Sequence, residues 1–71
     1  MPTPKYNDGM GVLYKTRNRY GEHYEFGIIL KPLILKIGID FKHEVFYEVY
    51  TKGIIVTIPE TMIQSSFEQP Y

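Results

Sequence analysis

Residues 44–58, EVFYEVYTKGIIVTI, decide the fold of this chain. Two runs with alternating apolar residues flank Lys52-Gly53, which predicts an antiparallel hairpin closed by a two-residue turn. Gly53 supplies the positive φ angle that such a turn requires. Residues opposed across an antiparallel ladder share a face, so the alternation predicts one apolar face that turns to the core. That face consists of Val45, Tyr47, Val49, Ile54, Val56 and Ile58.

The opposite face of the same hairpin also carries large apolar side chains, those of Phe46, Tyr50 and Ile55. An exposed aromatic patch of this kind is typical of a surface that binds a partner. The alternative is that the N-terminal segment or the tail ending at Tyr71 covers it. Phe46, Tyr50 and Ile55 are therefore the candidate protein-interaction residues.

Outward from the hairpin, alternation predicts strands at 10–16 and 24–30, an apolar continuation at 33–37 and a short last strand within 62–67. Residues 17–23 are polar and contain Gly21, which predicts a loop. Pro32 predicts an edge, a bulge or a bend, because it cannot donate to a ladder. Pro59 has the φ angle that starts a helical turn, so residues 59–62 are expected to form one tight 3-10 turn. The chain has no tryptophan, so three other aromatics are expected to fill the core. These are Tyr24 and Phe26 of the second strand and Tyr47 of the hairpin.

The pattern predicts an all-β fold, a strongly bent five-stranded small barrel with a one-turn 3-10 helix before the last strand. Curling into a barrel is favoured because it protects the edges of so small a sheet. We expect a flexible lead-in at 1–8, a single barrel domain at 9–68 and a tail at 69–71. A chain of 71 residues that is 44% hydrophobic is enough for one small core.

Several functional classes find no support in the residues. The chain has no cysteine, so disulfides and thiolate metal sites are excluded. His23 and His43 fall in predicted loops, and no metal or acid–base motif surrounds them, which favours a protein that is not an enzyme and needs no cofactor. The longest apolar run, near 28–39, is interrupted by Lys31, Pro32 and Lys36, so we expect no membrane segment and a cytoplasmic location, in the host if the protein is viral.

The charges are balanced overall but unevenly placed. Net charge is zero, which disfavours simple electrostatic binding of nucleic acid. The first half of the chain is nevertheless the basic one. Its cations and one loop aromatic, with the hairpin lysine, form the candidate nucleic-acid set: Lys15, Arg17, Arg19, Tyr20 and Lys52. In that interpretation the cations bind phosphates and Tyr20 stacks on a base.

The end of the hairpin resembles a known family. A tight hairpin followed by Ile58-Pro59-Glu60-Thr61-Met62-Ile63 is similar to the ending of SH3-like barrels, where a strand leads into one helical turn and a last strand. The segments GMGVLYK, YEFGIILK and VFYEVYTKGIIVTIPETMI resemble, in order and spacing, small SH3-like proteins of tailed phages whose role is unassigned. This resemblance implies a small barrel and assigns no activity.

A second, weaker resemblance is to Sm-like proteins. Residues 52–58, KGIIVTI, are similar to the second half of the Sm signature, and Gly38-Ile39-Asp40 to its first half. Glu44 stands where that family has a base-contacting asparagine, and the spacing to Lys52 is shorter than in the family. The resemblance implies RNA or single-stranded nucleic-acid binding.

Two functions are therefore expected as alternatives. The first is a non-enzymatic interaction module that associates with itself, as a homo-oligomer, or with a larger protein. The second is an Sm-like nucleic-acid binder. Zero net charge and the missing asparagine favour the first.

Overall fold

Five antiparallel strands form a single sheet in the computed structural model, which describes residues 2–68. The order across the sheet is β4-β3-β2-β1-β5. A 3-10 turn, η1 (Glu60–Met62), joins the two edge strands, so the predicted fold class is confirmed. The predicted tail at 69–71 lies outside the described residues. The strands are β1 (Gly11–Asn18), β2 (Gly21–Ile37), β3 (Lys42–Thr51), β4 (Ile54–Pro59) and β5 (Ile63–Phe67).

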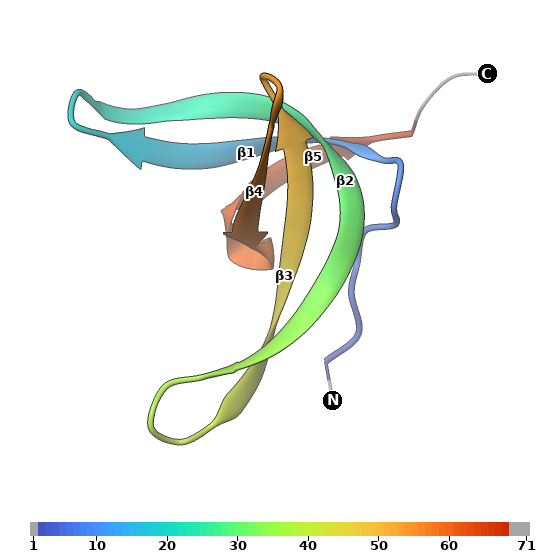
Figure 1. The fold of residues 1–71 in the computed structure, drawn as a ribbon, viewed down its shortest axis with the longest axis vertical. Helices are drawn as coiled ribbons and strands as arrows, with labels where there is room; N and C mark the ends of the chain where they lie inside the picture. Colours follow the sequence, from blue (N-terminus) through green and yellow to red (C-terminus); the bar gives the residue numbers. More distant parts are fainter. Residues whose placement is uncertain (1, 69–71) are drawn as a thin grey trace.

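The curvature of the sheet is concentrated in β2, which sweeps through the whole molecule (Figure 1). Its first half pairs with β1 and its second half with β3. The ladder with β3 shifts register between Ile29 and Lys31, and this bulge bends the strand. Pro32 follows directly and lies opposite Tyr47, in keeping with the predicted bulge or bend.

The predicted hairpin is confirmed in its register and its turn. Thr51 pairs with Ile54, Val49 with Val56 and Tyr47 with Ile58. Lys52 and Gly53 have φ angles of 51° and 82°, as the two central residues of a type I′ turn require.

All five strands contribute to one core on the concave side of the sheet. The buried cluster extends from β1 to β5, and Tyr47 and Val49 lie at its centre with no exposed surface. Its members are Val12, Tyr14, Ile29, Val45, Tyr47, Val49, Ile58 and Ile63.

The predicted inner face of β2 is wrong. Tyr24 and Phe26 are each 55% exposed, whereas Gly27 and Ile29 point to the core. The reason is a close approach of two strands, because a Cβ atom on Gly27 would overlap Cγ1 of Val49. Only glycine fits there, which fixes the register and turns the aromatics outward. One residue of the predicted inner face of the hairpin is also wrong, because Ile54, directly after the turn, is 59% exposed.

Two hairpins project from the body as arms (Figure 1). The predicted loop at 17–23 is wrong, since β1 and β2 continue through it and leave only Arg19 and Tyr20 as the turn. Within this extension, Lys15 Nζ lies 2.7 Å from Glu22 Oε2 on the neighbouring strand. The second arm is the distal part of β2 and β3.

The segment before β1 contacts the core through Tyr47. The Tyr47 hydroxyl accepts hydrogen bonds from the backbone N–H groups of Lys5 (3.0 Å) and Tyr6 (3.2 Å) and donates one to Glu60 Oε2 (2.5 Å). The rings of Tyr6 and Tyr47 pack edge to face with centroids 5.7 Å apart. Tyr47 therefore joins the N-terminal segment to η1. Between residues 2 and 68, no helix has the length and apolarity needed to cross a bilayer.

Candidate interaction surfaces

The three predicted interaction residues belong to two separate surfaces. Tyr50 and Ile55 lie directly opposite each other on the convex face, 48% and 60% exposed. Phe46 is half-buried and lies four ladder positions from Tyr50 along β3, opposite Leu33. Between them, Glu48 lies opposite Lys31, and these two side chains form an ion pair at 3.8 Å. This polar pair divides the predicted patch.

The Tyr50–Ile55 pair is part of an apolar row that crosses the whole sheet. Tyr50 lies opposite Ile28 on β2, Ile28 opposite Gly11 on β1, and Gly11 opposite Phe67 on β5. The five ladder positions are aligned, so their side chains lie on one face. Gly11 has no side chain of its own, but the neighbouring aromatic of β2 covers it. We call the resulting surface the body row: Ile55, Tyr50, Ile28, Phe26 and Phe67.

Gly11 is needed for the continuity of the body row. A Cβ atom at this position would lie 2.8 Å from Cζ of Phe26, so the ring of Phe26 occupies the space above β1. From there it reaches Phe67, with ring centroids 6.2 Å apart. Phe26 and Phe67 are both half exposed. No spacing in the sequence connects these two residues, which is why the sequence reasoning missed them.

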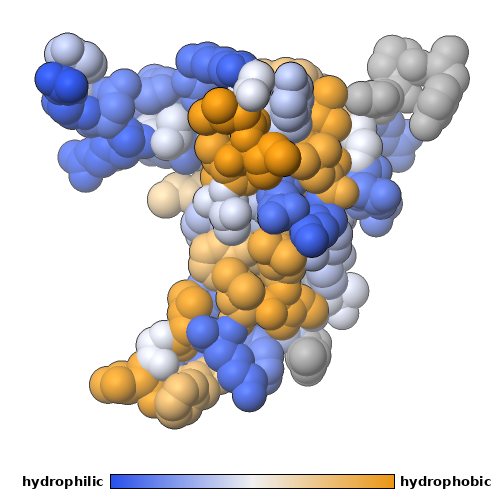
Figure 2. Space-filling model, in the orientation of Figure 1, coloured by the Kyte–Doolittle hydropathy of each residue, from blue (hydrophilic) through white to orange (hydrophobic). Residues whose placement is uncertain are grey.

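The second apolar surface is the β2–β3 arm, which consists of residues 33–46. Its convex face carries Leu33, Leu35 and Ile37 of β2, and its tip carries Ile39 and Phe41. Ile39 is 98% exposed and Phe41 is 69% exposed, with a φ of 54° that is unusual for an aromatic residue. Figure 2 shows apolar side chains over the body and along this arm, with a hydrophilic band between them.

The other arm, which we call the β1–β2 arm, consists of the parts of β1 and β2 next to the Arg19–Tyr20 turn. Its surface is hydrophilic (Figure 2). It gathers four members of the predicted nucleic-acid set: Lys15, Arg17, Arg19 and Tyr20. At its tip the Arg19 guanidinium lies 5.6 Å from the centre of the Tyr20 ring. Lys15 is engaged by Glu22, whose carboxylate raises the pKa of the lysine.

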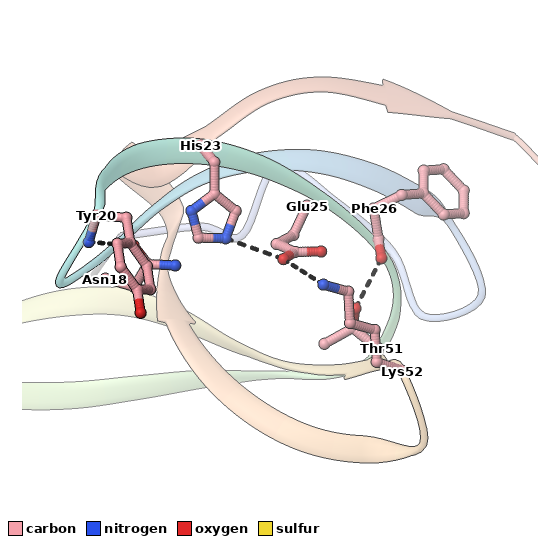
Figure 3. Close-up of polar contacts among 7 residues, drawn as sticks. All are labelled: Asn18, Tyr20, His23, Glu25, Phe26, Thr51 and Lys52. Carbon is pink, nitrogen blue, oxygen red and sulfur yellow. Dashed lines mark hydrogen bonds and ion pairs between the residues drawn. The ribbon is translucent and has the colours of Figure 1, made fainter.

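Lys52, the fifth member, lies on the β3–β4 turn and lines the same groove as Arg17. Its ammonium is 2.7 Å from Glu25 Oε1, which also lies 3.0 Å from His23 Nε2 (Figure 3). The hydrogen bond from Lys52 lowers the pKa of the Glu25 carboxyl most, and the hydrogen bond with His23 lowers it further. Beside this cluster, the Thr51 hydroxyl donates to the carbonyl of Phe26 at 2.8 Å (Figure 3).

The cluster joins the β3–β4 turn to β2. Glu25 Oε1 is engaged by both Lys52 Nζ and His23 Nε2, and no serine or threonine hydroxyl is hydrogen-bonded to His23 among residues 2–68. Within the same residues, no group of three or more potential ligands is placed to hold a metal ion.

Neither the family models, the curated proteins nor the solved structures include a match to this chain. The function of this protein is therefore inferred from its exposed surfaces.

Proposed function

We propose that this protein is a non-enzymatic interaction module that assembles with other copies of itself through the convex face of its sheet. The observation that carries this proposal is the body row, an unbroken apolar line over all five strands. Its members are large and mostly half exposed. Isolated exposed apolar residues are ordinary on protein surfaces, whereas contiguous patches mark contacts. Docking on a larger protein is the other form of the same function.

The test is the effect of Tyr50→Glu on association. Tyr50 lies between Ile55 and Ile28 in the body row. A carboxylate at this position would lose its water in any contact that covers the row. We expect wild-type protein to sediment above the monomer mass of 8.4 kDa. The substitution should weaken association by about tenfold or more, which corresponds to at least about 1.4 kcal/mol.

The matched control is Tyr20→Glu, which makes the same chemical change at the tip of the hydrophilic arm. It should leave the sedimentation profile as in the wild type. If Tyr50→Glu also leaves the profile unchanged, the body row is not the contact between copies.

One observation favours a second function, the binding of single-stranded nucleic acid. Three cations belong to one arm that has an exposed aromatic at its tip, and this combination can bind phosphates and stack on bases. We propose this only as the alternative, because Glu22 already neutralises Lys15 and Glu25 neutralises Lys52.

Fluorescence anisotropy with a single-stranded RNA at low salt tests the alternative. Binding should weaken with salt with a logarithmic slope of about −0.7 per phosphate contacted. Arg17→Glu combined with Arg19→Glu should abolish it. Lys5→Glu combined with Lys36→Glu makes the same change in net charge elsewhere and should reduce it far less. Equal losses in both variants would mean that net charge, and not this arm, determines binding.

A further inference from the structure

The β2–β3 arm has an apolar face that the rest of residues 2–68 leaves exposed. It is a two-stranded ribbon, and isolated ribbons of this kind are only marginally stable in water. Its convex face nevertheless exposes Leu35 and Ile37, and its tip exposes Ile39 almost completely. The arm is separated from the body row by the Lys31–Glu48 ion pair. It is therefore a second surface with its own requirement for a partner.

The charges on the convex face of the arm identify that partner. Leu35 lies opposite Glu44, and Ile37 lies opposite Lys42. The β2 side of this face is thus apolar, and its β3 side carries two opposite charges two residues apart. The Lys42 ammonium meets Asp40 only at 3.6 Å, with both side chains mostly exposed, and such a pair contributes little. No ion pair among residues 2–68 involves Glu44.

This pattern is complementary to itself when two arms meet face to face and run in opposite directions. The two-fold axis then lies between the two arms and runs across the strands, along the Lys36–His43 pair. It places position 42 of one copy over position 44 of the other, and position 35 over position 37. Lys42 then meets Glu44 of the second copy twice, and Leu35 meets Ile37 twice. Continuing the same spacing brings the tip, with Ile39, over Leu33 and Phe46.

We propose that the β2–β3 arm is a second interface between copies, in which two arms pack antiparallel across a two-fold axis. The proposal rests on the proposed function only in that both require self-association, because the two surfaces are separate. An arm with about five residues in each strand is about 17 Å long. A standard interface buries about 800 Å² on each partner, and the face of this arm is smaller. The contact is therefore weak, and its occupancy depends on protein concentration.

A chain with two separate interfaces of this kind assembles beyond the dimer. Loss of either interface leaves dimers held by the other, and loss of both leaves monomers. The assembly size therefore reports each surface separately, which distinguishes failure of this inference from failure of the proposed function.

The experiment is sedimentation velocity over a range of concentrations with charge-swapped arms. Lys42→Glu and Glu44→Lys, each alone, place like charges opposite each other and should reduce the assembly to the dimer. The double variant restores the opposite charges and should recover the wild-type size. Lys36→Glu is the control, because it makes the same charge change on the same arm but faces the other side. Its profile should match that of the wild type.

The outcomes separate cleanly. If all arm variants sediment like the wild type while Tyr50→Glu lowers the size, the arm inference is wrong and the proposed function stands. If the single swaps lower the size and the double variant does not recover it, the antiparallel geometry is wrong. Binding of the wild type to phosphatidylcholine vesicles that is lost in Ile39→Ser, without any change in sedimentation, would make lipid the occupant of the arm and would overturn the proposal.

Discussion

Replacing Gly27 with alanine is expected to lower the free energy of unfolding by about 1–3 kcal/mol, the usual cost of overpacking a core. The added Cβ would overlap Val49 Cγ1 and would lie 3.0 Å from the carbonyl oxygen of Tyr50. Val49 is fully buried, and the carbonyl belongs to the backbone, so neither can move away cheaply. The φ angle of Gly27 is not in the positive region, so the cost is steric. Replacing a glycine also reduces the conformational entropy of the unfolded chain, and this stabilises the folded protein by at most about 1 kcal/mol.

Urea denaturation at one fixed protein concentration measures this effect, because association would add to the apparent stability. Gly11→Ala is the matched control. Its Cβ would also approach another side chain closely, at 2.8 Å, but the neighbour is the outer end of the half-exposed Phe26 ring, which can turn away. We expect Gly11→Ala to cost clearly less stability than Gly27→Ala. Equal stability of Gly27→Ala and wild type would mean that the two strands do not approach as closely as described.

The β3–β4 hairpin was predictable because its signals agree. Lys52-Gly53 specifies the turn, and the alternation on both sides specifies the same inner face, so a slip of one residue would bury Glu48. Pro59 similarly predicts η1, since its fixed φ suits the start of a helical turn: it precedes Glu60 with a φ of −73°. Each of these features depends on residues that are close in sequence.

The face of β2 was not predictable from its own alternation. Tyr24, Phe26, Ile28 and Leu30 give a convincing apolar face, but the other face contains Gly27 and Ile29. Which face turns inward depends on Val49, far along the chain on β3, which fills the space that Gly27 leaves. The body row has the same origin. Its alignment from Ile55 to Phe67 requires the registers of four separate ladders, and no local pattern contains that information.

The substitution Tyr47→Phe is expected to destabilise the protein by about 1–3 kcal/mol, although phenylalanine fills nearly the same volume as tyrosine. The Tyr47 hydroxyl accepts from two backbone N–H groups and donates to Glu60. Without it, the N–H group of Tyr6 loses its acceptor, whereas that of Lys5 keeps Glu60 Oε2 at 3.1 Å. A polar group left unpaired in a partly buried place accounts for a cost of this size. Tyr50→Phe removes an exposed hydroxyl and should cost much less.

The same substitution should change how stability depends on pH. Burial, reinforced by the Glu60 carboxylate, raises the pKa of Tyr47 to about 12 from an ordinary value of 10.0. The folded protein therefore holds this proton more tightly than the unfolded chain. The corresponding stability is fully present below pH 10 and is lost as the pH rises towards 12, by at most about 1.4 kcal/mol per pH unit. The Tyr47→Phe variant has no phenolic proton to lose at this position, so this loss is absent from it.

The stability difference between wild type and Tyr47→Phe should therefore shrink between pH 10 and 12, while the other tyrosines titrate in both proteins and cancel. Parallel curves over that range would show that Tyr47 titrates like an exposed tyrosine, which contradicts its burial. A shrinking difference has a structural consequence as well. Because the hydroxyl donates to Glu60, ionisation removes that hydrogen bond and places a phenolate beside the Glu60 carboxylate, so charge repulsion separates η1 from Tyr47. The phenolate still accepts from the N–H groups of Lys5 and Tyr6, and these two hydrogen bonds favour the ionised form. Protection of the Tyr6 amide from hydrogen exchange should therefore persist after the contact with Glu60 is lost, until the sheet itself unfolds.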